Sequence, residues 1–172
     1  MDPLLSIGAL VLRAAPDSEE VDRYCGTAFY FRDNRTMITA AHVLREQPDL
    51  DIDHLAAIIT IRDEFIIVPV RRAYISRRMD LAVLAVEPVD EVIPLTTVTE
   101  RPALNEDLST LEFAASTHVR VADERRAFKV DRSFRKGHAI RWYTSDFPET
   151  VPTRCVDLSY PALKGASGAP VT

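Results

Sequence analysis

Short apolar segments separated by turn residues run through most of the chain, and they constrain its fold more than any other feature. Most are four to eight residues long and rich in β-branched or aromatic residues, a composition typical of strands. The predicted strands are residues 7–12, 27–31, 37–39, 58–61, 65–70, 81–86, 108–113, 139–143 and 151–158. An apolar pattern with the period of a helix occurs only as a short patch at residues 40–44. The sequence therefore predicts an all-β fold, closed into barrels or a sandwich so that strand edges are hidden.

Length and charge limit the organisation and the partners of the chain. Its 172 residues fit one domain or two small half-domains, and its content of Leu, Ile, Val and Phe is enough to bury a core. Thr, Glu, Pro and Asn interrupt the apolar segments at residues 94–107, which indicates a linker and a second half that begins near Leu104. The net charge of −5 has both signs interspersed, and the apolar run 4–12 is too short to span a bilayer. We therefore expect no nucleic-acid partner and no membrane association.

Local clusters of charge and of metal-ligating residue types have simple structural interpretations. Residues 120–136 hold an excess of Arg and Lys, which is more typical of a solvated hairpin than of a nucleic-acid site. Aspartates alternate at residues 49–53 without the glycine and glutamate of a calcium loop, so a solvated acidic turn is favoured. The five glycines leave no place for a phosphate-binding loop, and Cys25 and Cys155 form no CxxC pair. We expect no cofactor, no metal, no disulfide framework and a reducing, cytoplasmic setting.

The segment GASGAP at residues 165–170 carries the strongest chemical signal. It follows a predicted strand and a turn at Pro161. Its glycines allow the backbone to fold tightly around Ser167, and successive N–H groups can then converge on a developing oxyanion. We therefore expect Ser167 to be a nucleophile, with the N–H groups of Gly165 and Ser167 as the oxyanion hole.

A serine nucleophile needs a general base and a third group that orients this base. His42 follows a short predicted strand among small residues, in the segment TAAH at 39–42. Asp80 precedes a strongly apolar strand, in the segment DLAVL at 80–84, where burial would drive its carboxylate to pair with a histidine N–H. Each residue alone would more often be structural. The order His42, Asp80, Ser167, however, is the chain order of the chymotrypsin-like triad, so we interpret the three as a catalytic set.

These motifs together resemble those of the trypsin-like (chymotrypsin-fold) serine endopeptidases, especially their short bacterial members. The resemblance runs from about Leu4 to the last residue. It rests on CGTAF at 25–29, TAAH at 39–42, DLAVL at 80–84 and GASGAP at 165–170. By this resemblance His42 is the general base and then the general acid, Asp80 orients it, and Ser167 is the nucleophile.

The resemblance also implies a fold. Two six-stranded antiparallel barrels are expected, with the site in the cleft between them. Residues 1–100 would form the N-terminal barrel that carries His42 and Asp80. Residues 101–172 would form a partial C-terminal barrel that carries Ser167.

The chain departs from the family pattern at three positions. Val43 stands where secreted members have a cysteine that pairs with the one at Cys25, which supports a cytoplasmic setting. Ala166 replaces the aspartate that pairs with a new N-terminus in activated zymogens, so activation of that kind is not expected. Ala169 replaces a glycine, which should be tolerated if its φ is negative.

Specificity follows from the same resemblance. It places the wall of the primary substrate pocket at Pro161, Ala162, Leu163 and Lys164, and Pro161 lies where trypsin-type enzymes carry a pocket-floor aspartate. A basic substrate side chain would have no countercharge from that position. The hypothesis is a preference for small or medium apolar side chains before the scissile bond.

The favoured function is hydrolysis of peptide bonds in a protein or peptide substrate, by a protease domain of a larger or regulated protein. The family's second barrel continues beyond the nucleophile, so a further C-terminal segment or a partner is expected to complete it. We expect little or no activity from the chain in this form. The alternative is a catalytically silent, protease-like module that binds proteins.

Overall fold

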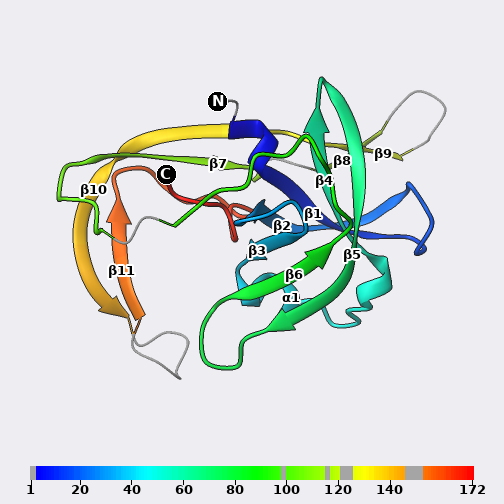
Figure 1. Ribbon diagram of the computed structural model, residues 1–172, viewed down its shortest axis with the longest axis horizontal. Helices are drawn as coiled ribbons and strands as arrows, with labels where there is room; N and C mark the ends of the chain where they lie inside the picture. The colour runs from blue at the N-terminus through cyan, green and yellow to red at the C-terminus, as the bar shows by residue number, and fades with distance from the viewer. Residues whose placement is uncertain (1–2, 98–99, 115–116, 121–125, 146–152) are drawn as a thin grey trace.

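The computed structural model describes residues 3–97, 100–114, 117–120, 126–145 and 153–172 (Figure 1). The prediction of an all-β fold is confirmed, because strands supply most of the regular structure. The helical elements are short: η1 (Pro3–Ser6), α1 (Ala41–Arg45) and η2 (Ile52–His54). Helix α1 coincides with the predicted helical patch at residues 40–44. No helix among the described residues is long and apolar enough to cross a membrane.

Six antiparallel strands close into a barrel in the first half of the chain (Figure 1). They are β1 (Ile7–Arg13), β2 (Val21–Tyr30), β3 (Thr36–Thr39), β4 (Leu55–Ile61), β5 (Glu64–Ile75) and β6 (Ala82–Val86). Their order around the barrel is β1-β2-β3-β6-β5-β4, and the pairing of β4 with β1 closes it. Each of these strands therefore has a hydrogen-bonded neighbour on both sides, which is the expected protection of strand edges.

Strands β1 and β4 are buried along their whole length, which explains why both are continuous apolar runs. Leu10 and Ile59 belong to the core inside the barrel. Their neighbours Ala9 and Ile58 belong to a second apolar cluster, which also contains Phe113 of the second half. The second half of the chain thus packs against the outer face of β1 and β4.

The second half forms a smaller, partial sheet and a hairpin. The sheet has the order β11-β10-β7, and the hairpin pairs β8 with β9. The strands are β7 (Asp107–Glu112), β8 (Thr117–Arg120), β9 (Arg126–Lys129), β10 (Ser133–Ser145) and β11 (Thr153–Leu158). The last described residues return beside β7, because the N–H of Ser109 donates to the carbonyl of Thr172 (2.7 Å) and that of Thr172 to Ser109 (2.8 Å).

The charged segment at residues 120–136 contributes to the β8–β9 hairpin and to the start of β10. Several of its cations lie next to carboxylates. The pairs are Lys129 with Asp131 (2.8 Å), Arg135 with Glu112 (2.6 Å) and Lys136 with Asp107 (2.9 Å). These three cations are therefore each paired with a carboxylate of the fold.

Each predicted strand corresponds to an observed one, but three begin at least three residues earlier than predicted. Strand β4 starts at Leu55 instead of residue 58. Strand β2 starts at Val21 instead of residue 27, and β10 starts at Ser133 instead of residue 139. Both extensions carry charged or polar side chains on an exposed face, which hides the apolar signal. Residues 151 and 152 of the last predicted strand lie outside the described residues.

Candidate active site

The three residues predicted as a catalytic set come from separate parts of the chain and lie together in the structure. His42 lies on α1, directly after β3, and Asp80 lies in the loop between β5 and β6. Ser167 lies in the irregular segment after β11. The Nδ1 atom of His42 is 2.6 Å from Oδ2 of Asp80, and its Nε2 atom is 2.8 Å from Oγ of Ser167. One imidazole thus bridges a carboxylate and a hydroxyl.

Buried neighbours hold His42 in place. On the same short helix Ala41, Val43 and Leu44 are buried, whereas the His42 side chain is 39 % exposed. The first turn of α1 is thereby packed into the barrel while its histidine faces the site. The small residues of TAAH allow this packing, since Ala41, next to His42 on α1, is fully buried.

Asp80 holds the histidine through both carboxylate oxygens. Oδ1 accepts the backbone N–H of His42 at 2.7 Å, while Oδ2 lies against Nδ1. An ionised carboxylate only accepts hydrogen bonds, so this contact places a proton on Nδ1 and leaves Nε2 of the neutral ring free to accept one from Ser167. The expectation that Asp80 would be buried is wrong, because its side chain is 34 % exposed. The residue lies before β6, in a loop that is open to solvent, and it reaches its partner there.

Two glycines allow the tight course of the chain around Ser167. Gly165 and Gly168 have φ angles of +93° and +87°, the region that favours glycine. A Cβ atom on Gly168 would lie 2.0 Å from the carbonyl oxygen of Thr27, so the chain can pass there only without a side chain. Ala169 is not among the residues with positive φ, which is the condition under which its replacement of glycine is tolerated.

Hydrogen bonds between residues three positions apart hold the loop on both sides of Ser167. The N–H of Ala166 donates to the carbonyl of Leu163 (3.0 Å), and the N–H of Ala169 donates to Ala166 (2.9 Å). The N–H groups of Gly165 and Ser167, the predicted oxyanion donors, donate to no group in the described part of the chain.

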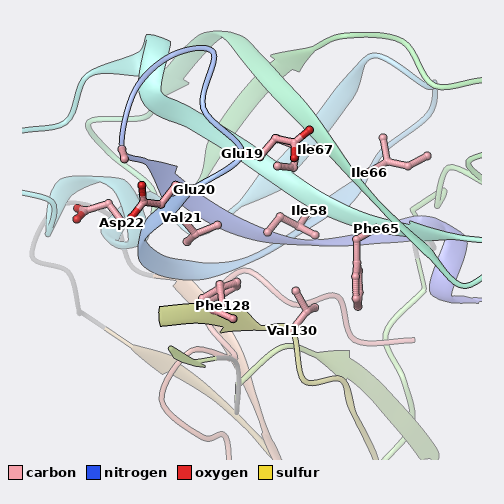
Figure 2. Close-up of a pocket in the computed structure, with 12 residues that line it drawn as sticks. Glu19, Glu20, Val21, Asp22, Ile58, Phe65, Ile66, Ile67, Phe128 and Val130 are labelled. Atoms are coloured by element: carbon pink, nitrogen blue, oxygen red, sulfur yellow. The ribbon is translucent and has the colours of Figure 1, made fainter. Parts of the chain in front are cut away.

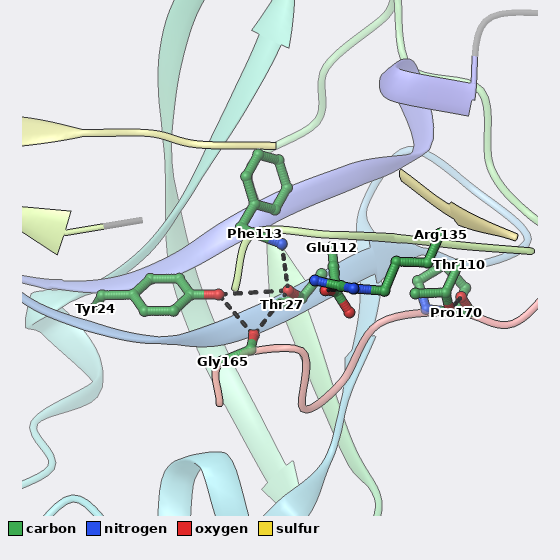
Figure 3. A network of polar contacts seen from close by, with 8 residues as sticks. All are labelled: Tyr24, Thr27, Thr110, Glu112, Phe113, Arg135, Gly165 and Pro170. Carbon is green, nitrogen blue, oxygen red and sulfur yellow. Dashed lines mark hydrogen bonds and ion pairs between the residues drawn. The ribbon is translucent and has the colours of Figure 1, made fainter. Parts of the chain in front are cut away.

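Two side chains of β2 contact this loop and were not found by sequence reasoning (Figure 3). The hydroxyl of Tyr24 donates to the carbonyl of Gly165 at 2.7 Å, and the hydroxyl of Thr27 donates to the same oxygen at 3.2 Å. Backbone atoms add to the contact, because the N–H of Thr27 donates to the carbonyl of Ser167 at 2.9 Å. No sequence signal marks these contacts, since they join positions about 140 residues apart.

The residues predicted to line the substrate pocket lie in the irregular segment between β11 and the Ser167 loop. Pro161, Ala162, Leu163 and Lys164 are all exposed. A separate cavity of about 790 Å³ lies elsewhere, between the β1–β2 turn, β4 and β5, and strand β9 (Figure 2). Phe65 and Phe128 line it, Glu19 and Glu20 lie at its rim, and none of its lining residues belongs to the His42–Asp80–Ser167 set.

Comparison with solved structures shows the fold of the chain. Rv3671c from M. tuberculosis H37Rv, a serine-to-alanine variant in its inactive form, superposes with a TM-score of 0.65 at 16 % identity, over 98 % of this chain and 69 % of that one. The inactive form of the Rv3671c protease gives 0.63 at 15 % identity, over 98 % and 71 %. Its active form gives 0.61 at 17 % identity, over 96 % and 64 %. The chain thus has a chymotrypsin-like fold, with a closed first barrel and a partial second sheet.

Sequence comparisons gave two further results. Curated protein sequences contain no match to this chain. The family model of the trypsin-like peptidase domain, in contrast, matches residues 26–172, which include His42, Asp80 and Ser167. Because this match spans most of its length, the chain belongs to the trypsin-like peptidase family.

Proposed function

We propose that this protein is a serine endopeptidase that cleaves peptide bonds through His42, Asp80 and Ser167. The observation that carries the proposal is the continuous hydrogen-bonded series from Asp80 through His42 to Ser167, with contacts of 2.6 and 2.8 Å. These distances are within reach for proton transfer, and the proton on Nδ1 leaves Nε2 as the base. A peptidase family and this geometry together favour acyl transfer over other hydrolytic chemistry.

The reaction follows from the geometry. Ser167 Oγ attacks the substrate carbonyl carbon while its proton moves to Nε2 of His42, and Asp80 stabilises the resulting imidazolium. The N–H groups of Gly165 and Ser167 donate to the oxyanion. His42 then protonates the leaving amine, which breaks the C–N bond and leaves an acyl ester on Ser167. A water molecule, deprotonated by His42, hydrolyses this ester and restores the serine.

Covalent labelling with a fluorophosphonate tests the proposal, because this reaction needs the nucleophile, the base and the oxyanion donors but no bound peptide. We expect the protein to be labelled on Ser167, and Ser167→Ala and His42→Ala to lose the label. His138→Ala is the matched control, since this exposed histidine lies in β10, outside the site. A folded protein with a complete second barrel that takes no label would refute the peptidase proposal and favour a silent, protein-binding module.

A second measurement addresses the histidine directly and does not depend on turnover. The Nδ1 proton shared with Asp80 should give a strongly downfield proton NMR signal. This signal should disappear in Asp80→Ala and persist in Ser167→Ala. Its absence from the parent protein would contradict the proposed role of Asp80.

In this mechanism the two parts of the chain supply different catalytic groups. Residues 1–100 supply the base and its orienting carboxylate on an N-terminal barrel, and residues 101–172 supply the nucleophile and the pocket wall. Pro161 would lie at the base of the primary pocket, where it offers no countercharge to a basic side chain. We therefore expect cleavage after small or medium apolar residues. Profiling with a peptide library would contradict this if Arg or Lys dominated before the scissile bond.

The setting proposed for the enzyme is the bacterial cytoplasm, as a regulated protease domain. Cys25 forms no disulfide within the described residues, and Val43 occupies the position at which a secreted relative would carry its partner. Alkylation of unfolded protein, taken from cells lysed in the presence of a thiol reagent, should modify Cys25 without prior reduction. Cys25 should react only after unfolding, because burial raises the pKa of its thiol to about 12.

A further inference from the structure

The hydroxyl groups of Tyr24 and Thr27 converge on one carbonyl of the nucleophile loop (Figure 3). This carbonyl belongs to Gly165, whose own N–H is one of the two proposed oxyanion donors. Tyr24 donates to it at 2.7 Å and Thr27 at 3.2 Å. Both side chains lie on β2 of the closed barrel, so a loop of the second half is held by a rigid element of the first.

The surroundings of the two hydroxyls leave them little freedom. Thr27 is fully buried, and its Oγ1 also accepts the N–H of Phe113 at 3.2 Å, so its own proton is directed to Gly165. The ring of Tyr24 stacks on Phe128 with the centroids 6.2 Å apart, which fixes the phenol. Burial also raises the pKa of Tyr24, so its hydroxyl keeps the proton that it donates.

Consecutive peptide units of the loop are each held at a known atom. Tyr24 and Thr27 hold the carbonyl of Gly165, and the N–H of Ala166 in the same planar unit donates to Leu163. The next carbonyl, of Ala166, is held by Ala169. The following one, of Ser167, is held by the N–H of Thr27. A planar peptide unit that is fixed at its carbonyl has the N–H of the next residue fixed as well, so the held Ala166 carbonyl fixes the N–H of Ser167, and the held Gly165 carbonyl fixes the backbone between Gly165 and Ala166.

We infer that Tyr24 and Thr27 are positioning residues of the oxyanion hole: their hydroxyls hold the Gly165–Ala166 peptide unit, which lies between the N–H groups of Gly165 and Ser167, and so keep the spacing of these two proposed donors. A glycine at φ +93° has few steric barriers to rotation. Without the two hydrogen bonds, the Gly165–Ala166 unit can rotate, which shifts Gly165 and its N–H relative to Ser167. This role rests on the proposed peptidase function and acts through the loop rather than on the substrate.

The test removes each hydroxyl with little change in shape. Tyr24→Phe keeps the stacked ring, and Thr27→Val keeps the β-branched side chain. The chain offers matched controls, because the hydroxyls of Tyr30 and Thr60 are also buried and have no hydrogen-bond partner in the described residues. Tyr30→Phe and Thr60→Val therefore remove the same groups from the barrel without touching the loop.

The readout is the rate of fluorophosphonate labelling, resolved into the chemical step and the affinity for the reagent. We expect the chemical step to slow about tenfold in each single variant, as for a lost hydrogen bond. In the double variant it should slow about a hundredfold, the order for loss of one oxyanion donor. Affinity should change little. Thr27→Ser, which restores a hydroxyl, should recover most of the loss.

Two further measurements separate positioning from general damage. The downfield Nδ1 proton of His42 should persist in every variant, because the contact of His42 with Asp80 does not involve β2. Thermal unfolding should show whether the buried N–H of Phe113, unpaired in Thr27→Val, destabilises the fold. Labelling of Tyr24→Phe at the parental rate would overturn the inference, and so would an equal loss in Tyr30→Phe. A parent protein that takes no label at all refutes the peptidase function instead.

Discussion

The first barrel and the second half of the chain bury their side chains in different ways. In the barrel, β1 and β4 are buried along their whole length, on both faces. In the second half, β10 is the longest strand, yet Ala139 is its only buried residue. Phe134 and Ile140 of that strand are 62 % and 52 % exposed. The barrel thus has a complete apolar core of its own. The second sheet buries few side chains by itself and packs part of its apolar surface against the barrel.

This difference explains how the site is assembled. His42 and Asp80 lie on the self-contained barrel, where the packing of α1 and the start of β6 fix them. Ser167 comes from an irregular loop that β7 holds at Pro170 through Thr110, and the barrel strand β2 holds the same loop on the other side of Ser167 through Thr27 and Tyr24. The position of the nucleophile therefore depends on the first half as well, although the residue belongs to the second.

The largest expected effect comes from breaking the contact between the two regions. In Gly168→Ala, the new Cβ would lie 2.0 Å from the Thr27 carbonyl and at a φ of +87°, so the Ser167 loop must move away from β2. We expect labelling to slow by about a hundredfold or more, since a displacement of about 1 Å has that effect.

Gly8→Ala in β1 is the control for this variant. Its Cβ would meet Ile59 at 3.0 Å, a tight apolar contact inside the barrel wall, and its φ is not positive. This variant should lower thermal stability and leave the labelling rate of the folded protein unchanged. Similar labelling rates for the two variants would show that the loop does not depend on β2.

Much of the first region could be predicted from sequence, and less of the second. Apolar runs such as 58–61 and 81–86 predicted barrel strands because their side chains face a core. The start of β10, with Phe134 and Lys136 on exposed faces, carries no such signal and was interpreted as part of a charged hairpin. Likewise, Ser167 was marked by its glycines. Tyr24, which holds the same loop, was not, because only the folded chain brings it to Gly165.

The next prediction concerns stability. It tests whether a buried polar contact stabilises the second half, as the apolar core stabilises the barrel. Glu112 is 1 % exposed, and Arg135 contacts it at 2.6 Å across the β7–β10 pair. Arg135→Met leaves this carboxylate buried without its partner and should lower the free energy of unfolding by about 3 kcal/mol. Urea denaturation gives this value. Arg141→Met, which breaks an exposed pair with Asp157, should cost no more than about 0.5 kcal/mol.

Truncation of large apolar residues compares the two regions directly. Leu84 of β6 is fully buried, so Leu84→Ala should lower the free energy of unfolding by about 2–5 kcal/mol. Phe134→Ala removes a larger side chain from β10, but that side chain is 62 % exposed, and the loss should stay within about 0.5 kcal/mol. Urea denaturation of both variants checks the contrast. A comparable loss for Phe134 would mean that a further contact covers its face of the second sheet.

The smallest effect is electrostatic and distinguishes two exposed carboxylates, one from each region. The backbone N–H of Arg35 lowers the pKa of Asp33 in the barrel, whereas the Lys136 side chain lowers the pKa of Asp107 at the start of β7. A pKa that is lower in the folded state adds stability above the unfolded value of about 4, and this contribution disappears as the pH falls through the folded value. Asp33→Asn and Asp107→Asn should therefore each weaken the loss of stability on acidification below pH about 4.

Added salt should remove the effect of Asp107→Asn, because an exposed ion pair is screened. It should leave most of the effect of Asp33→Asn, whose cause is a local hydrogen bond to the backbone. Thermal unfolding across pH at low and high salt measures both, and equal salt sensitivity would show that the two regions do not differ in how they hold a surface charge.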